Sequence, residues 1–524
     1  MKILEVYGDK VMGAIRGLDR VRFRGTVRWI SNDRGLKTFL GQAGILLKDF
    51  GRWVAGKTRD VRHSCEAQAQ ALEIEVQYLR SSSVDKEPLA RSIAAEQGVK
   101  PDGSICMFSV VEPCWSAQVE GNRSEQKLQV RLRERKCVWV YHYWDDPEVG
   151  FGHVRIQTWL PFSVTLCING RHWLEKQLQA AKVAYIKDGN CFPWIEDWAV
   201  AQELLDAQLK TDWPALLNRL MRAACPIVSD VCAPFTLHHH WSADEVEWAT
   251  DVAFASGKEL QRIYPRLIHY GMQVSDSRSV MRYLGRTQMQ ASGDLRGRLP
   301  KDLVTTRERF YEGVRIKHSI NGNSEKAYNK SFNILRAEMT TNKTRDFKVF
   351  RPANDEETRP PSWLPLRKGV SDLHRRCVIS DNANTRYLDM LCAANVDQTL
   401  REVAAPACNP VRKDGRRYRG LNAWNEEDFK LLAFLGRGEL ALNGFRNKDL
   451  RASLYPCANE PDSAERKRQS GAVSRRIRLL RAHGLIRKVA RENRYVLSPK
   501  GQDFVKALLT VSGLEAKALM EMAA

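Results

Sequence analysis

The sequence predicts a multidomain protein of the mixed α/β (α+β) class, with an N-terminal α/β region that contains an antiparallel sheet, a helical middle and a small C-terminal module. Three observations support this prediction. The chain has 524 residues, too many for one ordinary hydrophobic core. Strand-like and helix-like segments alternate near the N-terminus, as in α/β units. The segments that follow are rich in β-branched and aromatic residues and are separated by turn signals, which favours antiparallel pairing.

Residues 1–112 are expected to form a small α/β domain. VRFRGTV (21–27) alternates apolar and basic residues, so its apolar side chains should face a core and its basic neighbours the opposite side. These basic neighbours, Arg20, Arg22 and Arg24, are candidates for contacting phosphate. Helices are expected at 33–50, 58–72 and 85–97, and strands at 75–80 and 105–111.

Residues 113–353 are expected to form a β-rich and helical central domain. Strands are expected in KLQVRLR (127–133), KCVWVYHYW (136–144), HVRIQTW (153–159) and FSVTLCI (162–168), and helices in AVAQELLDAQL (199–209) and DWPALLNRLMRAA (212–224). Ser242 and Glu245 have the spacing of a capping box, which predicts a helix that begins at Ser242. That helix would place Glu247 and Asp251 on one face.

EGVRIKHSINGNSEKAYNKSFNILRAEMTTN (312–342) closes this domain as a basic hairpin. Its cationic side chains Arg315, Lys317 and Arg336 are candidates for binding the phosphates of nucleic acid. Residues 354–420 are expected to form a linker and helical connector, because NDEETRPPSWLPLRKG (354–369) contains three prolines and mixed charge. Helices are expected at 371–379 and 383–395, before the basic stretch NPVRKDGRRYRG (409–420).

The last part of the chain, residues 421–524, has the order of elements of a winged helix-turn-helix. Helices are expected in EEDFKLLAFLGRG (426–438), GFRNKDLRASL (444–454), GAVSRRIRLLRAHGLI (471–486) and GQDFVKALL (501–509), with two short strands in IRKVARENRYVLS (486–498). The third helix carries Val473, Ile477 and Leu480 at the spacing of a buried face. Residues expected on its outer face or on the wing are Ser474, Arg475, Arg478, Arg481, Arg491 and Arg494. This part resembles the winged-helix domains of MarR-type regulators, which implies that the third helix enters the major groove and the wing touches the backbone.

The charge predicts a polyanionic partner. The net charge is +21, and residues 411–524 alone hold 24 Lys and Arg against 13 Asp and Glu. Such an excess favours DNA or RNA, because each cation set against a phosphate releases a counterion. No apolar stretch is long enough to span a membrane and the first twenty residues are charged throughout, so we expect a cytoplasmic protein. The twelve cysteines are scattered without a C-x-x-C pair, which favours reduced thiols over a zinc site.

The whole chain resembles a large, mostly uncharacterised group of bacterial proteins of about five hundred residues with a MarR-like winged helix at the C-terminus. The matching stretches are FRGTV (23–27), WSADEVEWATD (241–251), YNKSFNILRAEMTTN (328–342), YRGLNAWNEEDF (418–429) and GFRNKDLRA (444–452). The hairpin is also similar to a Tyr-x-Lys and Arg-x-Glu pattern of phage and plasmid replication initiators. That resemblance implies Tyr328 as a nucleophile, Lys330 and Arg336 as phosphate contacts and Glu338 as a metal ligand.

Three classes of function therefore remain open. The first is a nucleic-acid-binding protein associated with a mobile element or a ribonucleoprotein, or a MarR-like transcriptional regulator. The second is a metal-dependent endonuclease or nicking enzyme, in which Glu247, Asp251 and Glu338 would hold Mg²⁺ or Mn²⁺. Against the second, these acids have basic neighbours with which they could form a structural ion-pair network, and the chain has no His-hydrophobe-His pair. A protein-interaction scaffold is a third alternative. The oligomeric state is not predicted.

Overall fold

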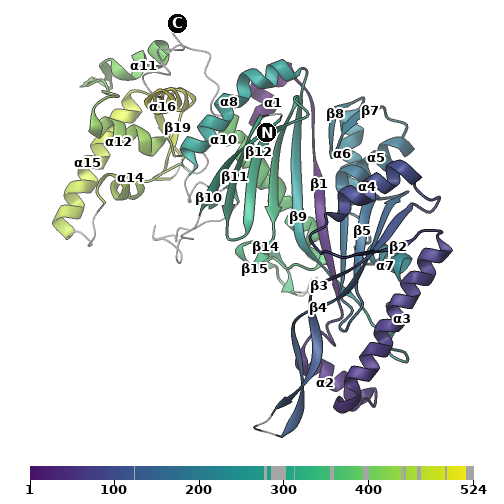
Figure 1. The fold of residues 1–524 in the computed structure, drawn as a ribbon. Coiled ribbons are helices and arrows are strands. Elements are labelled where there is room, and N and C mark those ends of the chain that lie inside the picture. The colour runs from purple at the N-terminus through teal and green to yellow at the C-terminus, as the bar shows by residue number, and fades with distance from the viewer. Residues whose placement is uncertain are drawn as a thin grey trace. The chain divides into compact units, whose positions relative to one another are not determined.

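The computed structural model shows a mixed α/β protein, as the sequence predicts. It describes residues 1–122, 124, 126–275, 280–281, 283–284, 303–311, 313–353, 359–392, 400–437, 440, 444–456, 462–489 and 492–514. Within these residues eleven strands form the main sheet (Figure 1). In spatial order they are β10 (Val304–Phe310), β11 (Gly313–Ile320), β12 (Asn323–Lys330), β13 (Ile334–Thr341), β9 (His240–Phe254), β1 (Val11–Thr26), β6 (Val164–Asn169), β5 (Gly150–Gln157), β4 (Lys127–Asp146), β3 (Ser104–Asn122) and β2 (Val76–Leu79). The sheet is mixed, because β2 pairs with β3 in parallel whereas β3, β4, β5 and β6 pair antiparallel.

The chain divides into two compact units, each assembled from separate segments. The first unit comprises Met1–Ala14, Thr250–Met339 and Ile379–Ala524. The second unit comprises Ile15–Ala249 and Thr340–Val378. Each unit therefore depends on contacts between segments that are far apart in the sequence.

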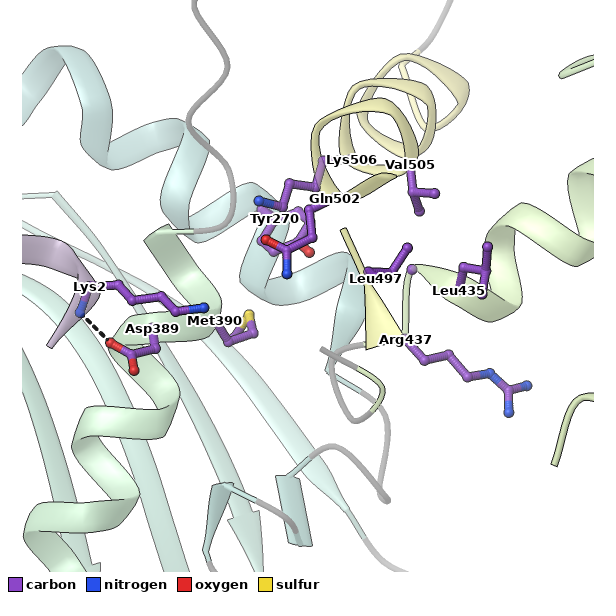
Figure 2. Close-up of a pocket in the computed structure, with 11 residues that line it drawn as sticks. Lys2, Tyr270, Asp389, Met390, Leu435, Arg437, Leu497, Gln502, Val505 and Lys506 are labelled. Atoms are coloured by element: carbon purple, nitrogen blue, oxygen red, sulfur yellow. Dashed lines mark hydrogen bonds between the residues drawn. The ribbon is translucent and has the colours of Figure 1, made fainter. Parts of the chain in front are cut away.

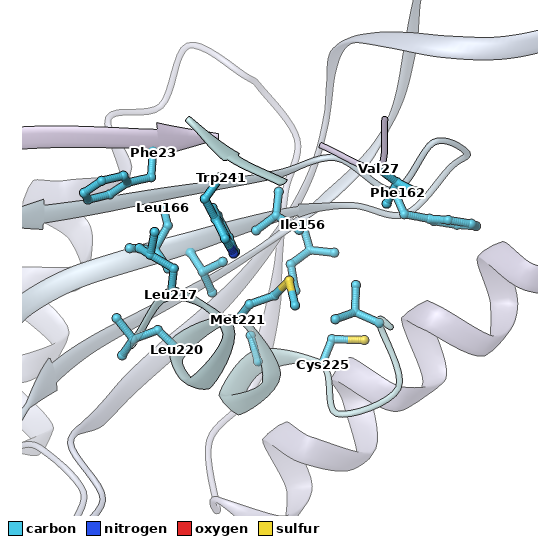
Figure 3. Packing of buried hydrophobic residues seen from close by; sticks show 14 of the residues in the cluster. Phe23, Val27, Ile156, Phe162, Leu166, Leu217, Leu220, Met221, Cys225 and Trp241 are labelled. Carbon is cyan, nitrogen blue, oxygen red and sulfur yellow. The ribbon is translucent and has the colours of Figure 1, made fainter. Parts of the chain in front are cut away.

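The second unit packs helices against the strands β1, β3, β4, β5 and β6. Its helices are α2 (Asp33–Gln42), η2 (Leu47–Asp49), α3 (Phe50–Ala71), α4 (Lys86–Gln97), α5 (Gly170–Ala180), α6 (Trp198–Gln208), α7 (Trp213–Ala224), η3 (Thr344–Asp346) and η5 (Val370–Asp372). Two small sheets pair β7 (Tyr185–Asp188) with β8 (Cys191–Ile195) and β14 (Lys348–Arg351) with β15 (Ser362–Pro365). Figure 3 shows the core, where Leu217 and Met221 of α7 meet Phe23, Leu166 and Trp241. The predicted alternation in β1 is confirmed, because Val21 and Phe23 are buried whereas Arg20, Arg22 and Arg24 are exposed.

The helix predicted at 33–50 is interrupted. α2 ends at Gln42, and the chain turns at Gly44, whose φ of 69° suits glycine and ends helices. A new helix, α3, then starts at Phe50, earlier than the predicted 58–72. The helices predicted at 371–379 and 383–395 are a single helix in the part that the structure describes, α10 (Leu373–Leu391).

The helix predicted to begin at Ser242 is wrong, because residues His240–Phe254 form the strand β9. The hydroxyl of Ser242 lies 3.4 Å from the carbonyl oxygen of Arg24, and Glu245 forms ion pairs with arginines of β1. The capping pattern is therefore present in the sequence, but the side chains of Ser242 and Glu245 contact β1 instead of capping a helix. Aromatic and β-branched residues on the buried side of the segment favour a strand once a neighbouring strand is available.

The first unit combines β10 to β13 with the helices α1 (Lys2–Val6), η1 (Gly8–Lys10) and α8 (Gly257–Val274). Ser256 caps α8 by accepting a hydrogen bond from the backbone N–H of Glu259. The predicted basic hairpin is present as β11 and β12, with Lys317 opposite Lys326 and His318 opposite Glu325. Among the described helices, none is both long enough and apolar enough to cross a bilayer.

The same unit contains the C-terminal module. Its elements are α11 (Leu400–Cys408), β16 (Val411–Lys413), β17 (Arg416–Tyr418), α12 (Glu426–Leu435), α14 (Asn447–Leu454), α15 (Ser463–Ala482), β18 (Ile486–Lys488), β19 (Tyr495–Leu497) and α16 (Pro499–Ser512). Leu431, Phe445, Ile477 and Phe504 meet in its core. Figure 1 shows α12, α14, α15 and α16 grouped together, so this module has its own hydrophobic centre.

Candidate nucleic-acid interface and buried ion network

The predicted catalytic residues of the hairpin lie in a dense network of hydrogen bonds. The hydroxyl of Tyr328 donates to Oε2 of Glu338 at 2.6 Å, and Nζ of Lys326 donates to Oε1 at 2.5 Å. Glu338 is almost completely buried. Burial alone would raise its pKa, but the charge and hydrogen bond of Lys326 and the hydrogen bond of Tyr328 lower it instead. A carboxylate with a lowered pKa is a poor proton acceptor, so it is badly suited to activating Tyr328.

Arg336 and Asp251 form a second buried pair. Nε and Nη2 of Arg336 donate to the two carboxylate oxygens of Asp251 at 2.5 and 2.8 Å. Both side chains are essentially inaccessible to solvent. This bidentate geometry fixes the guanidinium inside the unit, so Arg336 is not placed where a nucleic acid could reach it.

The three acids predicted to bind a metal each have a basic partner. Asp251 binds Arg336 and Glu338 binds Lys326, whereas Glu247 belongs to the second unit and lies 3.5 Å from Arg20. In a strand Glu247 and Asp251 are separated by about 13 Å, because each residue advances the chain by roughly 3.3 Å. No cluster of three or more His, Cys, Asp or Glu that could hold a metal occurs in the described part of the chain.

Other hairpin cations differ in their surroundings. Arg315 pairs with Glu308 of the neighbouring strand β10 and covers the ring of Phe310. Lys317 and Lys330 are half-buried. With Lys317 directly opposite Lys326, like charges face each other, and the carboxylate of Glu338 offsets that repulsion.

Glu338→Gln should lower the free energy of unfolding at pH 7 by about 3 kcal/mol, because it leaves the ammonium group of Lys326 without its carboxylate. The pKa of Glu338 is lower in the folded protein than its ordinary value of 4.5, so its stabilising contribution is present above pH 4.5 and is lost as the pH falls through the folded value. Urea unfolding of both proteins between neutral and acidic pH measures this. The difference between them should shrink below pH 4.5, and a constant difference would contradict the assigned role.

The predicted arginines of β1 lie on an exposed face with acids of β9 beside them. Arg20 is 2.9 Å from Glu245, and Arg24 is 2.5 Å from Asp244. Arg22 also reaches Glu245, at 3.7 Å. Such exposed pairs contribute little to stability, so their main effect is to orient the arginine side chains. A phosphate would have to compete with the carboxylates for these arginines.

The helix α15 presents a different arrangement. Val473, Ile477 and Leu480 are buried in the module, which confirms the predicted core face. Arg475, Arg478 and Arg481 are exposed on the other side. Within the described residues, none of these three guanidinium groups has an ion-pair partner. Unmatched cations at helical spacing leave a strip of positive charge facing solvent.

The other residues predicted for this surface fall in several places. Ser474 accepts a hydrogen bond at 2.9 Å from Nδ2 of Asn447, so it links α15 to α14. Arg494 pairs with Glu492 at 3.0 Å beside the hairpin of β18 and β19. Arg491 lies outside the described residues.

The helix α15 also begins eight residues earlier than its predicted start at Gly471. Asp462 caps it by accepting from the backbone N–H of Glu465 at 2.7 Å, and the helix runs for 20 residues. The sequence contains the signal, since Asp462 and Glu465 have capping-box spacing. Lys467 therefore lies on the helix, on the same side as Arg475 and Arg478.

Between α12 and α14, Phe445 forms an isolated β-bridge with Tyr495 of β19, and their backbones exchange hydrogen bonds of 2.7 and 2.8 Å. In the described part of the module, the order is a helix, a bridge, two helices and a hairpin. No protein-family model, curated protein or solved structure matches this chain. The geometry of the residues themselves is the basis for the functional proposal.

Sequence reasoning missed a second basic hairpin. β16 and β17 carry the exposed cations Arg412, Lys413, Arg416 and Arg417, and Nζ of Lys413 donates to the carbonyl oxygen of Arg481 at 3.3 Å. The signal was Asp414-Gly415, both with positive φ, which is the turn chemistry of a two-residue hairpin. The composition of residues 409–420 predicts only a basic connector. Exposed cations also occur on β18, at Arg487 and Lys488.

A small cavity lies beside α16 (Figure 2). It has a volume of about 30 Å³, and its walls include Tyr270, Met390 and Lys506. Burial lowers the pKa of Lys506 to about 8. The cavity has room for little more than a water molecule, so we do not consider it a ligand site.

Proposed function

We propose that the protein binds duplex DNA through its C-terminal module, which acts as a winged helix-turn-helix. In this proposal α15 lies in the major groove and the hairpin of β18 and β19 contacts the phosphate backbone. The observation that supports it most directly is the contrast between two sets of arginines. Those of β1 already have carboxylate partners, whereas Arg475, Arg478 and Arg481 have no acidic partner in the described structure.

The dimensions of α15 favour DNA over double-stranded RNA. A helix of 20 residues is about 30 Å long, enough to follow the groove with its cationic strip. The major groove of B-form DNA admits an α-helix, whereas that of A-form RNA is too deep and narrow for side chains to read. Arginine also suits this role, because its planar group makes two hydrogen bonds to guanine or phosphate at once.

The nuclease alternative has less support. Both oxygens of Glu338 accept hydrogen bonds, and Asp251 is bound by Arg336. These contacts match the structural ion-pair network rather than a metal site. We therefore do not propose cleavage as the function.

Titration of the full-length protein with a labelled duplex DNA and a duplex RNA of the same sequence tests the proposal. Binding to DNA should be the tighter of the two and should weaken as salt rises between about 50 and 300 mM, with a slope of log K against log salt of about −4 to −5 if five cations each displace one counterion. The five are the three arginines of α15 with Arg487 and Lys488. Equal affinity for RNA, or a slope near zero, would refute the groove assignment.

A further inference from the structure

The second unit contains a large polar cavity that the proposed DNA-binding surface does not use. Its volume is about 670 Å³, within the size range of small-molecule sites. Its walls come from β1, β5 and β9 of the sheet, from β6 with the directly following α5, from α4, and from β7 with the turn after it. Residues from six separate stretches of the chain thus face one space.

The arrangement around His172 points to an anion. Nζ of Lys187 lies 2.8 Å from Nδ1 of His172, and Nη2 of Arg91 lies 3.4 Å from Nε2. Both neighbours can only donate hydrogen bonds, whereas a neutral imidazole has one acceptor nitrogen and a protonated imidazole has none. In either state at least one of these two N–H groups finds no acceptor on the ring, although both cations also have carboxylate partners. A negatively charged group beside the ring would accept from an imidazole N–H and from the cationic N–H that finds no acceptor on the ring.

The cations are held in position by other contacts. Arg91 donates to Glu87 at 2.8 Å and lies 3.8 Å from the ring centre of Phe151. Lys187 is paired with Glu175. Burial tends to raise the pKa of Glu175, but the neighbouring His172 ring and Lys187 ammonium lower it to about 2, so the carboxylate stays charged. Both cationic groups are therefore oriented before any ligand arrives, which reduces the entropic penalty of binding.

The start of α5 adds to this positive potential. Asn169 caps the helix, and both Asn169 and His172 line the cavity. The N-terminal end of a helix carries a partial positive charge that favours phosphate. Together with Arg91 and Lys187, it makes one end of the cavity suited to a phosphate group.

The rest of the cavity is suited to a larger molecule than phosphate. Glu247 and Asn190 bring an acceptor and an amide to the wall. The ring of His153 lies against that of Tyr143, with 4.7 Å between centroids, and burial lowers its pKa to about 4, so it is a neutral flat surface at pH 7. Such walls fit hydroxyl groups and a planar ring, and a bare phosphate would leave most of the volume unfilled.

We propose that this cavity binds a nucleoside phosphate, with the phosphate beside Arg91, His172 and Lys187 and the nucleoside directed toward Glu247 and His153. The source of this chemistry is either a free mononucleotide or the phosphorylated end of a nucleic-acid strand. The site is distinct from α15, and its occupancy does not depend on the proposed DNA binding.

Isothermal titration of the full-length protein with AMP, UMP, adenosine and inorganic phosphate tests the site. At least one mononucleotide should bind clearly more tightly than adenosine and phosphate, which each supply one part of the ligand. Arg91→Gln and Lys187→Met should each weaken that binding about tenfold or more, since a charge-assisted hydrogen bond contributes roughly 1.5–3 kcal/mol. Absence of mononucleotide binding, or equal affinity for the nucleoside alone, would overturn the proposal.

Lys176→Met is the matched control. Lys176 lies on α5, the helix that carries His172, and like Arg91 and Lys187 it is in an ion pair, with Asp145 at 2.9 Å. It does not line the cavity, so its replacement should leave nucleotide affinity unchanged. Arg91 is largely exposed and its replacement should not impair folding, which thermal unfolding without ligand checks. An equal loss in Arg91→Gln and Lys176→Met would overturn the assignment of the phosphate position.

Oligonucleotides with a 5′-phosphate or a 5′-hydroxyl distinguish the two sources. A preference for the phosphorylated strand that disappears in Arg91→Gln identifies strand ends as the ligand, whereas binding of mononucleotides without this preference identifies a free nucleotide. A variant with alanine at Arg475, Arg478 and Arg481 should still bind mononucleotide. The experiments therefore distinguish a failure of the DNA-binding proposal from a failure of the nucleotide-binding proposal.

Discussion

Replacing Arg475, Arg478 and Arg481 together by alanine should weaken binding of duplex DNA about 100-fold or more at low salt. Each guanidinium that contacts phosphate or a base edge contributes roughly 1–3 kcal/mol, and the three are exposed and unmatched by acids of the described structure. The salt slope should become shallower by about two to three units, because three fewer counterions are released. Fluorescence anisotropy at several salt concentrations measures both quantities.

The control for this variant is Lys430→Ala. Lys430 is an exposed cation of α12 in the same module, but Glu426 pairs with it at 2.6 Å. Its removal should change the affinity for duplex DNA by at most about twofold and should leave the salt slope unchanged, because its charge is already matched by Glu426. The triple variant should unfold at the same temperature as the original protein, since exposed side chains contribute little to stability. A triple variant with an unchanged slope would show that α15 does not face the duplex.

Arg336→Met should destabilise the first unit by about 3–5 kcal/mol. The replacement leaves the carboxylate of Asp251 buried without its bidentate partner, and an unpaired buried charge is far more costly than a lost surface contact. The double variant Arg336→Met with Asp251→Leu should recover much of the loss, because replacing a buried ion pair by apolar groups of similar volume is often close to neutral. Urea unfolding followed by circular dichroism measures the change in transition midpoint.

Arg315→Met serves as the comparison. Arg315 also pairs with an acid of an adjacent strand, Glu308, but both side chains are partly exposed. The loss should be at most about 1 kcal/mol, as for other exposed pairs. If Arg336→Met were as mild as Arg315→Met, Asp251 would have to be compensated by another group, and the buried network would not be the structural element described above.

The residues that suggested catalysis overlap with the residues that hold the hairpin together. The resemblance to replication initiators rests on Tyr328 with Lys330 and on Arg336 with Glu338. In the structure both oxygens of Glu338 accept hydrogen bonds and its pKa is lowered by neighbouring groups despite burial. Residue types and spacing alone do not distinguish the two roles, because both require a carboxylate beside a cation.

Local periodicity was sufficient for several elements. The alternation in β1 correctly predicted which side chains are buried, and the spacing of Val473, Ile477 and Leu480 correctly predicted the core face of α15. These predictions succeed because burial follows the repeat of a single element, two residues in a strand and 3.6 in a helix. Capping and turn chemistry near Asp462 and Asp414 was equally local and could have been recognised.

Tertiary structure decided the rest. The segment that begins at His240 satisfies a helix-capping pattern, yet it forms β9 because its arginine partners on β1 and its buried aromatic side chains are available only after the sheet assembles. The polar cavity is a stronger case, since Arg91 and Lys187 are separated by nearly a hundred residues and meet only through the packing of α4, α5 and β7. By itself the sequence determined the elements that have a clear repeat and the charge of their exposed faces. Which side chains converge was decided by the pairing of segments distant in the chain, because no local repeat encodes it.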